Sequence, residues 1–127
     1  MYRFFPKVAI NDSTVEYVKV MDGARCSVRG DNYNTYNLIK LLYLPEETTY
    51  FSAYVFRNIK IEKLYMNIKN PLTLPVGYGD NINSCSEIYV PIGSASLYHS
   101  ATNWNSYSRD YIEYDFDTDP DNIRPHL

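Results

Sequence analysis

The sequence has few of the residues on which active centres and secreted scaffolds usually depend. Its 127 residues include two cysteines, two histidines and one tryptophan. Cys26 and Cys85 allow one disulfide at most, whereas small secreted scaffolds usually have four or more cysteines. We therefore expect both cysteines to be reduced core residues, and the sequence leaves open whether they pair.

Long apolar runs are also missing. The longest apolar clusters are residues 41–44 and 64–66, far short of the roughly 18 residues that a membrane-spanning helix needs. Residues 1–7 carry two charges and a proline, which is unlike a secretory signal. These absences predict a soluble protein with no membrane span, located in the cytoplasm of the producing cell or in a virion and not secreted by a signal peptide.

A strong positive charge is absent as well. The formal net charge is −3, which argues against a protein that binds nucleic acid by neutralising its phosphates. Acidic residues are concentrated in residues 110–127, where six of them accompany Arg124 alone. Residues 118–127 contain Pro120 and Pro125 and show no apolar periodicity. We predict one β-rich globular domain, residues 1–117, and an acidic, proline-containing C-terminal tail, residues 118–127.

What the sequence has in excess is tyrosine and asparagine, with 14 and 12 residues. Most of the chain alternates apolar and polar residues with period two and is rich in Val, Ile, Tyr and Thr, which favours strands. The clearest strand candidates are residues 14–20, 48–57, 86–92 and 110–117. Short strands separated by frequent turn residues predict a mainly β fold: a single-domain antiparallel β-sandwich or small barrel with at most one or two short helices.

The turn signal Asp22-Gly23 sets the expected direction of the first strands. It follows residues 14–20 and predicts a hairpin in which residues 24–29 pair back. Two segments fit both a strand and a short helix. These are residues 37–44 and residues 58–69.

No metal or cofactor site is predicted. The acidic run from Asp115 to Asp121 is superficially similar to a calcium-binding EF-hand loop, but Pro120 stands where a glycine is needed and His126 where a glutamate is needed. The two cysteines and two histidines are too widely separated in sequence for the close ligand pairs of zinc sites.

The sequence contains few residues that could act as a catalytic base or nucleophile. We therefore predict no catalytic residues and a protein that is not an enzyme. His126 is the penultimate residue and makes a poor base. His99 is the one candidate, with Glu87, Asp110 or a cysteine as partner, and no nucleophile motif accompanies it. A small hydrolase or ribonuclease centred on His99 is therefore kept as an alternative.

The segment 94–114 combines aromatic residues and arginine with small polar residues. This composition is typical of recognition surfaces, because aromatic side chains give a large contact area at small entropic cost. The competing interpretation is that Trp104 fills the core and the tyrosines pack along strands. The predicted binding residues in this segment are Tyr98, Asn103, Trp104, Asn105, Tyr107 and Arg109. Tyr78, which stands between two glycines outside the segment, is predicted to bind as well.

Together these features predict a non-enzymatic binding or structural protein. The leading expectation is a β-sandwich subunit of a larger assembly such as a virus or phage particle. A soluble carbohydrate-binding, protein-binding or inhibitor domain is the alternative. The expected partners are other proteins or copies of the chain itself, with a glycan as a further candidate.

Overall fold

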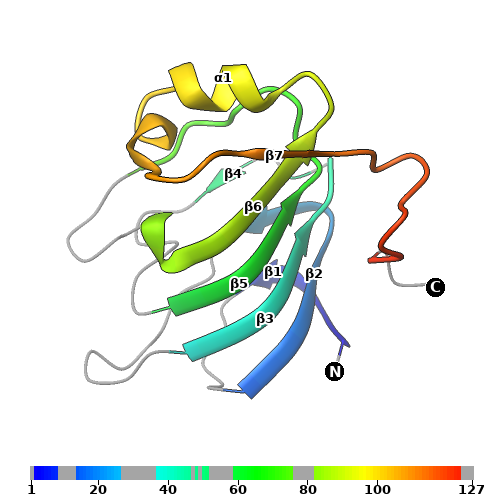
Figure 1. Cartoon of the computed structure of the whole chain (residues 1–127). Coiled ribbons are helices and arrows are strands. Elements are labelled where there is room, and N and C mark those ends of the chain that lie inside the picture. The colour runs from blue at the N-terminus through cyan, green and yellow to red at the C-terminus, as the bar shows by residue number, and fades with distance from the viewer. Residues whose placement is uncertain are drawn as a thin grey trace.

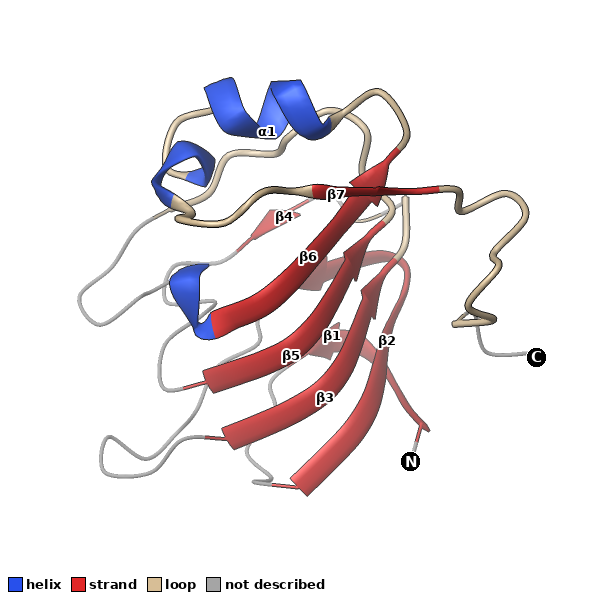
Figure 2. Cartoon of the chain, viewed as in Figure 1, coloured by secondary structure: helices blue, strands red, loops and turns tan. Residues whose placement is uncertain are grey.

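The computed structural model describes residues 2–8, 14–26, 37–46, 48, 50–51, 59–75 and 82–123. Within these residues the secondary structure is mostly strand, with one short α-helix and two 3-10 turns (Figure 2). The strands are β1 (Tyr2–Val8), β2 (Thr14–Cys26), β3 (Asn37–Leu44), β4 (Tyr50–Phe51), β5 (Ile59–Met66), β6 (Cys85–Pro91) and β7 (Ile112–Tyr114). The helical elements are η1 (Ile82–Ser84), α1 (Ala95–Ser100) and η2 (Trp104–Ser106).

The described strands form one sheet in which every pairing is parallel. The order is β1-β2-β3-β5-β6-β7, and β4 also pairs with β2. Figure 1 shows β2, β3, β5 and β6 side by side and running in the same direction. The predicted antiparallel β-sandwich or small barrel is therefore wrong, although the predicted predominance of strands and the small share of helix agree with the structure.

The physical reason for this error lies in the apolar clusters. Parallel sheets are covered on both faces, so their strands contain continuous apolar runs instead of a strict alternation. Residues 41–44 of β3 and 64–66 of β5 are such runs, and each is buried on both faces of the sheet. Apolar clusters of this kind indicate parallel strands. Their length alone shows only that they are too short to span a membrane.

The predicted hairpin at Asp22-Gly23 is also wrong. Both residues lie inside β2, which continues to Cys26. β2 instead pairs in parallel with the later strand β3. The two ambiguous segments are now resolved: residues 37–44 form β3, and in residues 58–69 strand β5 ends at Met66. Of the predicted strand 48–57, Tyr50–Phe51 is described as β4, and residues 52–58 lie outside the described part.

From β2 onward along the sheet, neighbouring strands are offset in sequence by a nearly constant length, whereas β1 and β2 are offset by less. The paired residues Thr14 and Leu38, Leu38 and Lys60, Ile61 and Cys85, and Tyr89 and Ile112 are 24, 22, 24 and 23 positions apart. Each strand together with its connection therefore forms one coil, and successive coils stack through their strands. Such an arrangement is a solenoid, in which each coil contacts mainly its neighbours.

One face of the sheet, which we call the inner face, packs against the connections. The connections supply apolar side chains that cover this face, and η1, α1 and η2 lie within them. The buried residues of this core are Leu42, Leu44, Phe51, Ile61, Leu64, Met66, Ile68, Leu74, Ile82, Cys85, Ile88, Val90, Tyr98, Trp104, Tyr107 and Tyr111. Most of the buried apolar surface of the described residues is therefore here, and it joins consecutive coils.

The opposite face, the outer face, carries a row of tyrosines. Tyr43, Tyr65 and Tyr89 occupy equivalent positions on β3, β5 and β6. The rings of Tyr65 and Tyr89 are stacked, with centroids 4.2 Å apart. Residues 114–123, which we call the C-terminal strap, pack on this row through Tyr114, Phe116 and Ile123.

No helix among the described residues is long and apolar enough to cross a membrane. This agrees with the sequence-based expectation that the chain has no membrane span.

The assignment of the two faces of β5 can be tested by mutation. Leu64 is fully buried on the inner face and its neighbour Lys63 is exposed. We expect Leu64→Ala to lower the free energy of unfolding by about 2–5 kcal/mol, because it removes buried contacts and leaves a cavity. Lys63→Ala should change it by less than about 0.5 kcal/mol. Urea denaturation measures both, and equal losses would contradict the assignment.

Candidate functional site

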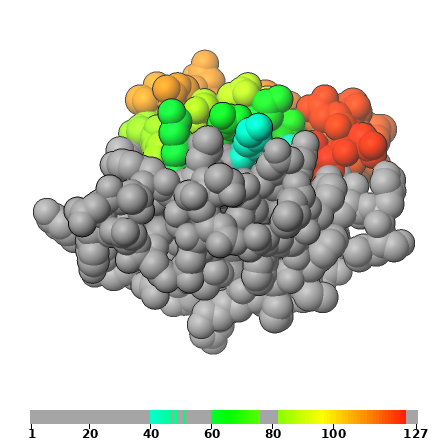
Figure 3. All heavy atoms as spheres, turned by 90° about the horizontal axis from the view of Figure 1, so that it is seen from below, coloured from blue at the N-terminus to red at the C-terminus, as the bar shows by residue number. Residues whose placement is uncertain are grey.

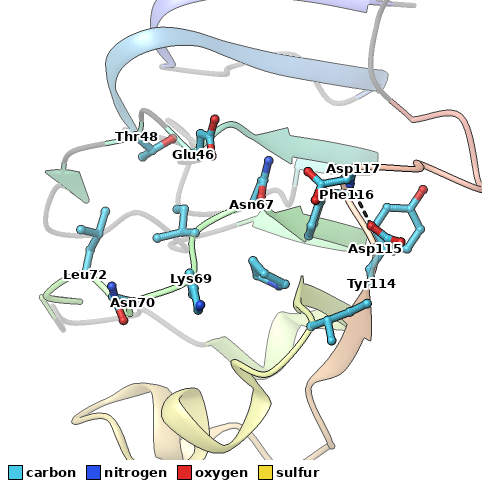
Figure 4. A pocket seen from close by; sticks show the side chains of 13 residues that line it. Glu46, Thr48, Asn67, Lys69, Asn70, Leu72, Tyr114, Asp115, Phe116 and Asp117 are labelled. Carbon is cyan, nitrogen blue, oxygen red and sulfur yellow. Dashed lines mark hydrogen bonds between the residues drawn. The ribbon is translucent and has the colours of Figure 1, made fainter.

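The main cavity lies where several strands end. Its volume is about 680 Å³, and we call it the carboxyl-edge groove. Carboxyl ends of parallel strands meet at one edge of a sheet, so the residues after β3, β5 and β6 come together there. The strap supplies another wall (Figure 4). The lining residues are Glu46, Thr48, Asn67, Ile68, Lys69, Asn70, Leu72, Pro91, Ile92, Tyr114, Asp115, Phe116 and Asp117.

Most of the charged side chains that the described residues contribute to the groove are acidic. Glu46, Asp115 and Asp117 contribute three carboxylates, and Lys69 contributes one ammonium group. Asp115 Oδ1 accepts hydrogen bonds from the backbone N–H groups of Asp117 and Thr118, at 3.0 and 3.3 Å. Hydrogen bonds from Thr118 and then Asp117 lower the pKa of Asp115, so this carboxylate stays charged at neutral pH.

One of the lining residues, Thr48, has an enclosed side-chain hydroxyl without a hydrogen-bond partner. The backbone N–H of Thr48 donates to the Pro45 carbonyl oxygen at 3.0 Å, which fixes the turn after β3. The Thr48 side chain is only 4% exposed, and its hydroxyl has no hydrogen-bond partner. A buried polar group left without a partner costs about 1–3 kcal/mol. Because the oxygen is enclosed by protein atoms, this cost falls on the fold, and an occupant of the groove does not reach the hydroxyl.

The amide of Asn67, another lining residue, is held in place by β3. Its backbone N–H donates to the Leu44 carbonyl oxygen at 2.9 Å, and its side-chain amide donates to the Tyr43 hydroxyl at 3.5 Å. Asn67 thereby joins the turn after β5 to the end of β3. The wall formed by Thr48 and Asn67 belongs to two consecutive coils.

The strap wall is held by bonds between tyrosine and aspartate. The Tyr65 hydroxyl donates to Asp121 at 2.9 Å, and the Tyr114 hydroxyl donates to Asp119 at 2.5 Å. The Asp121 N–H in turn donates to the Tyr114 hydroxyl at 2.9 Å. Ile123 is buried against the outer face. Residues 118–123 of the segment predicted as a tail are thus attached to the sheet.

The three aromatic side chains among the predicted binding residues of segment 94–114 are buried. The Tyr98 hydroxyl donates to the Ile68 carbonyl oxygen at 2.6 Å, and Trp104 Nε1 donates to the Leu72 carbonyl oxygen at 2.8 Å. The Tyr107 hydroxyl donates to the Cys85 carbonyl oxygen at 2.9 Å. Their ring faces contact the core, as the competing packing interpretation expects.

The other predicted binding residues are placed differently. Asn103 has a positive φ of 71° and donates from its side-chain amide to the Leu74 carbonyl oxygen at 2.6 Å. Asn105 and Arg109 are exposed, and Arg109 reaches the Cys85 carbonyl oxygen at 3.3 Å. Tyr78 lies outside the described residues. A binding role for the exposed members of this set stays a prediction.

His99 lies beside one of its predicted partners. Its Nε2 is 4.0 Å from Asp110 Oδ1, and its ring packs against the edge of Tyr111. The Asp110 side chain is fully exposed to water. His99 lines neither the carboxyl-edge groove nor a second, smaller cavity between residues 71–74 and 101–104.

The described residues contain no group of three His, Cys, Asp or Glu side chains placed to hold a metal ion. Cys85 is buried with a free thiol, and burial raises its pKa. Whether Cys26 pairs elsewhere stays open, because its side chain lies outside the described part.

The sequence-based search missed the groove, because single residues from separate turns form its walls. The signal that points to it is a recurring spacing of apolar residues, Ile61-x-x-Leu64-x-Met66 and Cys85-x-x-Ile88-x-Val90, 24 positions apart. This spacing defines the strand in each coil, and the groove residues follow directly after it. No family model, curated protein or solved structure matches this chain.

The buried tyrosines predict instability at alkaline pH. Burial raises the pKa of Tyr89 to about 12, and burial also raises the pKa of the five other tyrosines Tyr65, Tyr98, Tyr107, Tyr111 and Tyr114. Unfolded tyrosine releases its proton near pH 10, so the folded state binds more protons above that pH. The stability contribution is complete below about pH 10 and is lost as pH rises through the raised pKa values.

We therefore expect cooperative unfolding above about pH 10, accompanied by a steep rise in tyrosinate absorbance. Circular dichroism and absorbance measured on the same samples should change together. Gradual tyrosine ionisation near pH 10 with unchanged circular dichroism would contradict the burial of these phenols.

The strap attachment gives a separate prediction. Tyr65→Phe removes the hydroxyl that bonds Asp121, and Tyr89→Phe removes a hydroxyl that bonds Glu87 at 2.9 Å on the sheet itself. We expect Tyr65→Phe to speed amide hydrogen exchange in residues 115–123 roughly fivefold or more, in line with about 1 kcal/mol for a hydrogen bond. Tyr89→Phe should leave exchange in the strap unchanged, and equal effects would contradict this attachment.

Proposed function

We propose that this chain is a non-enzymatic binding module that takes a segment of a partner protein into the carboxyl-edge groove. The observation that supports it most directly is a cavity of ligand-binding size, about 680 Å³, whose lining combines charged groups and amides with apolar side chains. Turns positioned by a rigid scaffold commonly carry binding residues, and here the scaffold is the parallel sheet.

The lining favours a peptide over a sugar. Sugar recognition generally uses an open aromatic face, yet the aromatic residues that line the groove, Tyr114 and Phe116, are buried. The polar lining combines carboxylates, an ammonium group and the amides of Asn67 and Asn70. Such groups match the N–H and C=O groups of an extended peptide, while Leu72 and Ile92 offer apolar contact to its side chains.

A subunit role in a larger assembly is the second candidate. Among the residues whose exposure is described, three large apolar side chains are exposed, and they favour contact with copies of the chain: Ile92, Leu97 and Ile112. Ile92, 62% exposed, also lines the groove, so self-association through this face would compete with peptide binding. Sedimentation at several protein concentrations distinguishes the two, because self-association raises the mass with concentration.

The proposal is tested with two matched substitutions of exposed asparagines. Asn70 lines the groove, whereas Asn105 lies in the 3-10 turn η2. Seen from below, the C-terminal segment beside the groove and the residues around 100–110 lie at opposite sides of the described surface (Figure 3). The binding probe is a displayed library of random twelve-residue peptides selected on the whole chain.

We expect Asn70→Trp to weaken the selected peptides at least about tenfold by filling the groove, and Asn105→Trp to leave affinity unchanged. Fluorescence polarisation measures affinity, and circular dichroism confirms folding of both variants. Loss of affinity with Asn105→Trp alone would instead favour the aromatic segment 94–114 as the binding surface. Failure to select any peptide would overturn the proposed function.

A further inference from the structure

The sheet ends in two strands that each pair on one side. β7 pairs with β6 and β1 pairs with β2, and no other described strand pairs with either of them. The strap that follows β7 turns to the outer face and packs there on the tyrosine row. A strand at the edge of a sheet presents backbone N–H and C=O groups that can pair with another chain. Both ends of the described sheet can therefore be extended.

The common direction of the strands favours one mode of extension. Every described pairing is parallel, so β1 and β7 run the same way along the sheet. A second copy in the same orientation brings its β1 beside β7, and the new pair is again parallel. Such a head-to-tail contact repeats the stacking of one coil on the next. A two-fold axis would instead pair β7 with β7 in antiparallel directions.

The pairing with β6 assigns each residue of β7 to a face. Ile112 pairs with Tyr89 and occupies an outer position, whereas Glu113 pairs with Val90 and occupies an inner position. Tyr114 is again on the outer face, in the cluster of the strap. Ile112 is 37% exposed, and Glu113 is exposed as well. This edge therefore offers an apolar residue and a carboxylate on opposite faces.

The helix α1 belongs to the same end of the sheet. The backbone N–H of Ala95 donates to Glu113 Oε2 at 3.2 Å, so the start of α1 lies beside β7. Leu97 in this helix is 41% exposed. Two of the exposed large apolar side chains, Leu97 and Ile112, thus belong to elements that contact each other at the free edge. An apolar contact there would remove both from water.

The register of β1 gives it a matching alternation. Arg3 pairs with Val18, which pairs with Leu42 of the inner face. Arg3 therefore occupies an inner position, and its neighbours Tyr2 and Phe4 occupy outer positions. Residues 2–8 also include Lys7 and contain no acidic residue. β1 is thus basic and apolar where β7 is acidic and apolar.

One alignment of the two edges satisfies both patterns. Parallel pairing of residues 112–114 with residues 2–4 of a second copy keeps inner positions beside inner positions. A shift by one residue would exchange the faces, and a shift by two would separate the opposite charges. Opposite charges in a cross-strand pair are favourable, and like charges are unfavourable. The alignment forms three pairs: Glu113 with Arg3, Ile112 with Tyr2, and Tyr114 with Phe4.

We infer that the free edge of β7 binds β1 of a second copy of this chain in parallel, with Glu113 opposite Arg3. In a symmetric β7–β7 dimer centred on Glu113, this carboxylate would face its own copy and be repelled. The inference rests on the subunit role, the second candidate above, and specifies its contact. It does not depend on peptide binding in the carboxyl-edge groove.

The first test measures the mass of the whole chain by sedimentation equilibrium. Pairing of three residues gives a small interface, so we expect the average mass to rise between about 10 µM and 1 mM. It should pass beyond that of a dimer without a plateau, because a head-to-tail contact leaves a free edge at each end. A mass that stays constant over this range would overturn the inference and the subunit role together.

The second test exchanges the charges of the inferred pair. Glu113→Arg and Arg3→Glu each place like charges opposite one another, so each should weaken self-association at least about tenfold. An equimolar mixture of the two variants should recover association, because every contact between unlike variants pairs opposite charges. If both variants are weakened but their mixture does not recover, the inferred pairing is wrong.

The matched control is Glu62→Arg, which changes the net charge by the same amount as Glu113→Arg. Glu62 is exposed on β5, in the interior of the sheet order, so we expect association to be unchanged. Circular dichroism confirms that each variant is folded. Equal weakening by Glu62→Arg and Glu113→Arg would mean that net charge alone controls association, and the inferred contact would be wrong.

The remaining outcomes separate this inference from the other proposals. Weakening by Glu113→Arg but not by Arg3→Glu would indicate a β7–β7 dimer. Association that neither variant changes would indicate another surface. Both results overturn the inferred contact and leave the subunit role standing. Selection of peptides on the groove is measured independently, so its success or failure does not decide this inference.

Discussion

Burying irregular backbone is the constraint on which this structure depends. A connection that packs on a sheet has carbonyl groups that no neighbouring strand can pair, and each of them needs another donor. Here the connection between β6 and β7 supplies those donors to the preceding one. Tyr98 bonds Ile68, Asn103 bonds Leu74, and Trp104 bonds Leu72. Side-chain donors from one coil therefore hold the backbone of the preceding coil.

This constraint explains the unusual composition. A buried tyrosine or tryptophan contributes a large apolar surface and one donor, which is what a packed connection with free carbonyl groups requires. Tyr111 does the same within its own connection, where its hydroxyl donates to the Trp104 carbonyl oxygen at 2.6 Å. The aromatic residues that resembled a recognition surface in the sequence are thus largely structural in the described part of the chain.

The sequence predicted strands well and their direction badly. Residues 14–20, 86–92 and 110–117 each contain strand, because local alternation and β-branched residues are local signals. Strand direction is decided by pairing over more than twenty residues. Equivalent inward positions of successive coils also hold different apolar residues, as with Ile61 and Cys85. The repeat of inward apolar residues in successive coils is therefore hard to recognise in the sequence. The candidate site was missed for the same reason, since the residues after β3 and those after β5 line one groove only because the two strands are parallel and adjacent.

The distribution of the groove walls over separate coils has a consequence for how such a protein can change. Substitutions at exposed wall positions, such as Glu46 after β3 or Asn70 after β5, change neither the strand register nor the buried residues of the inner face. Each turn alters one wall only. Substitutions in one turn can therefore change the specificity of the groove at one wall without destabilising the sheet.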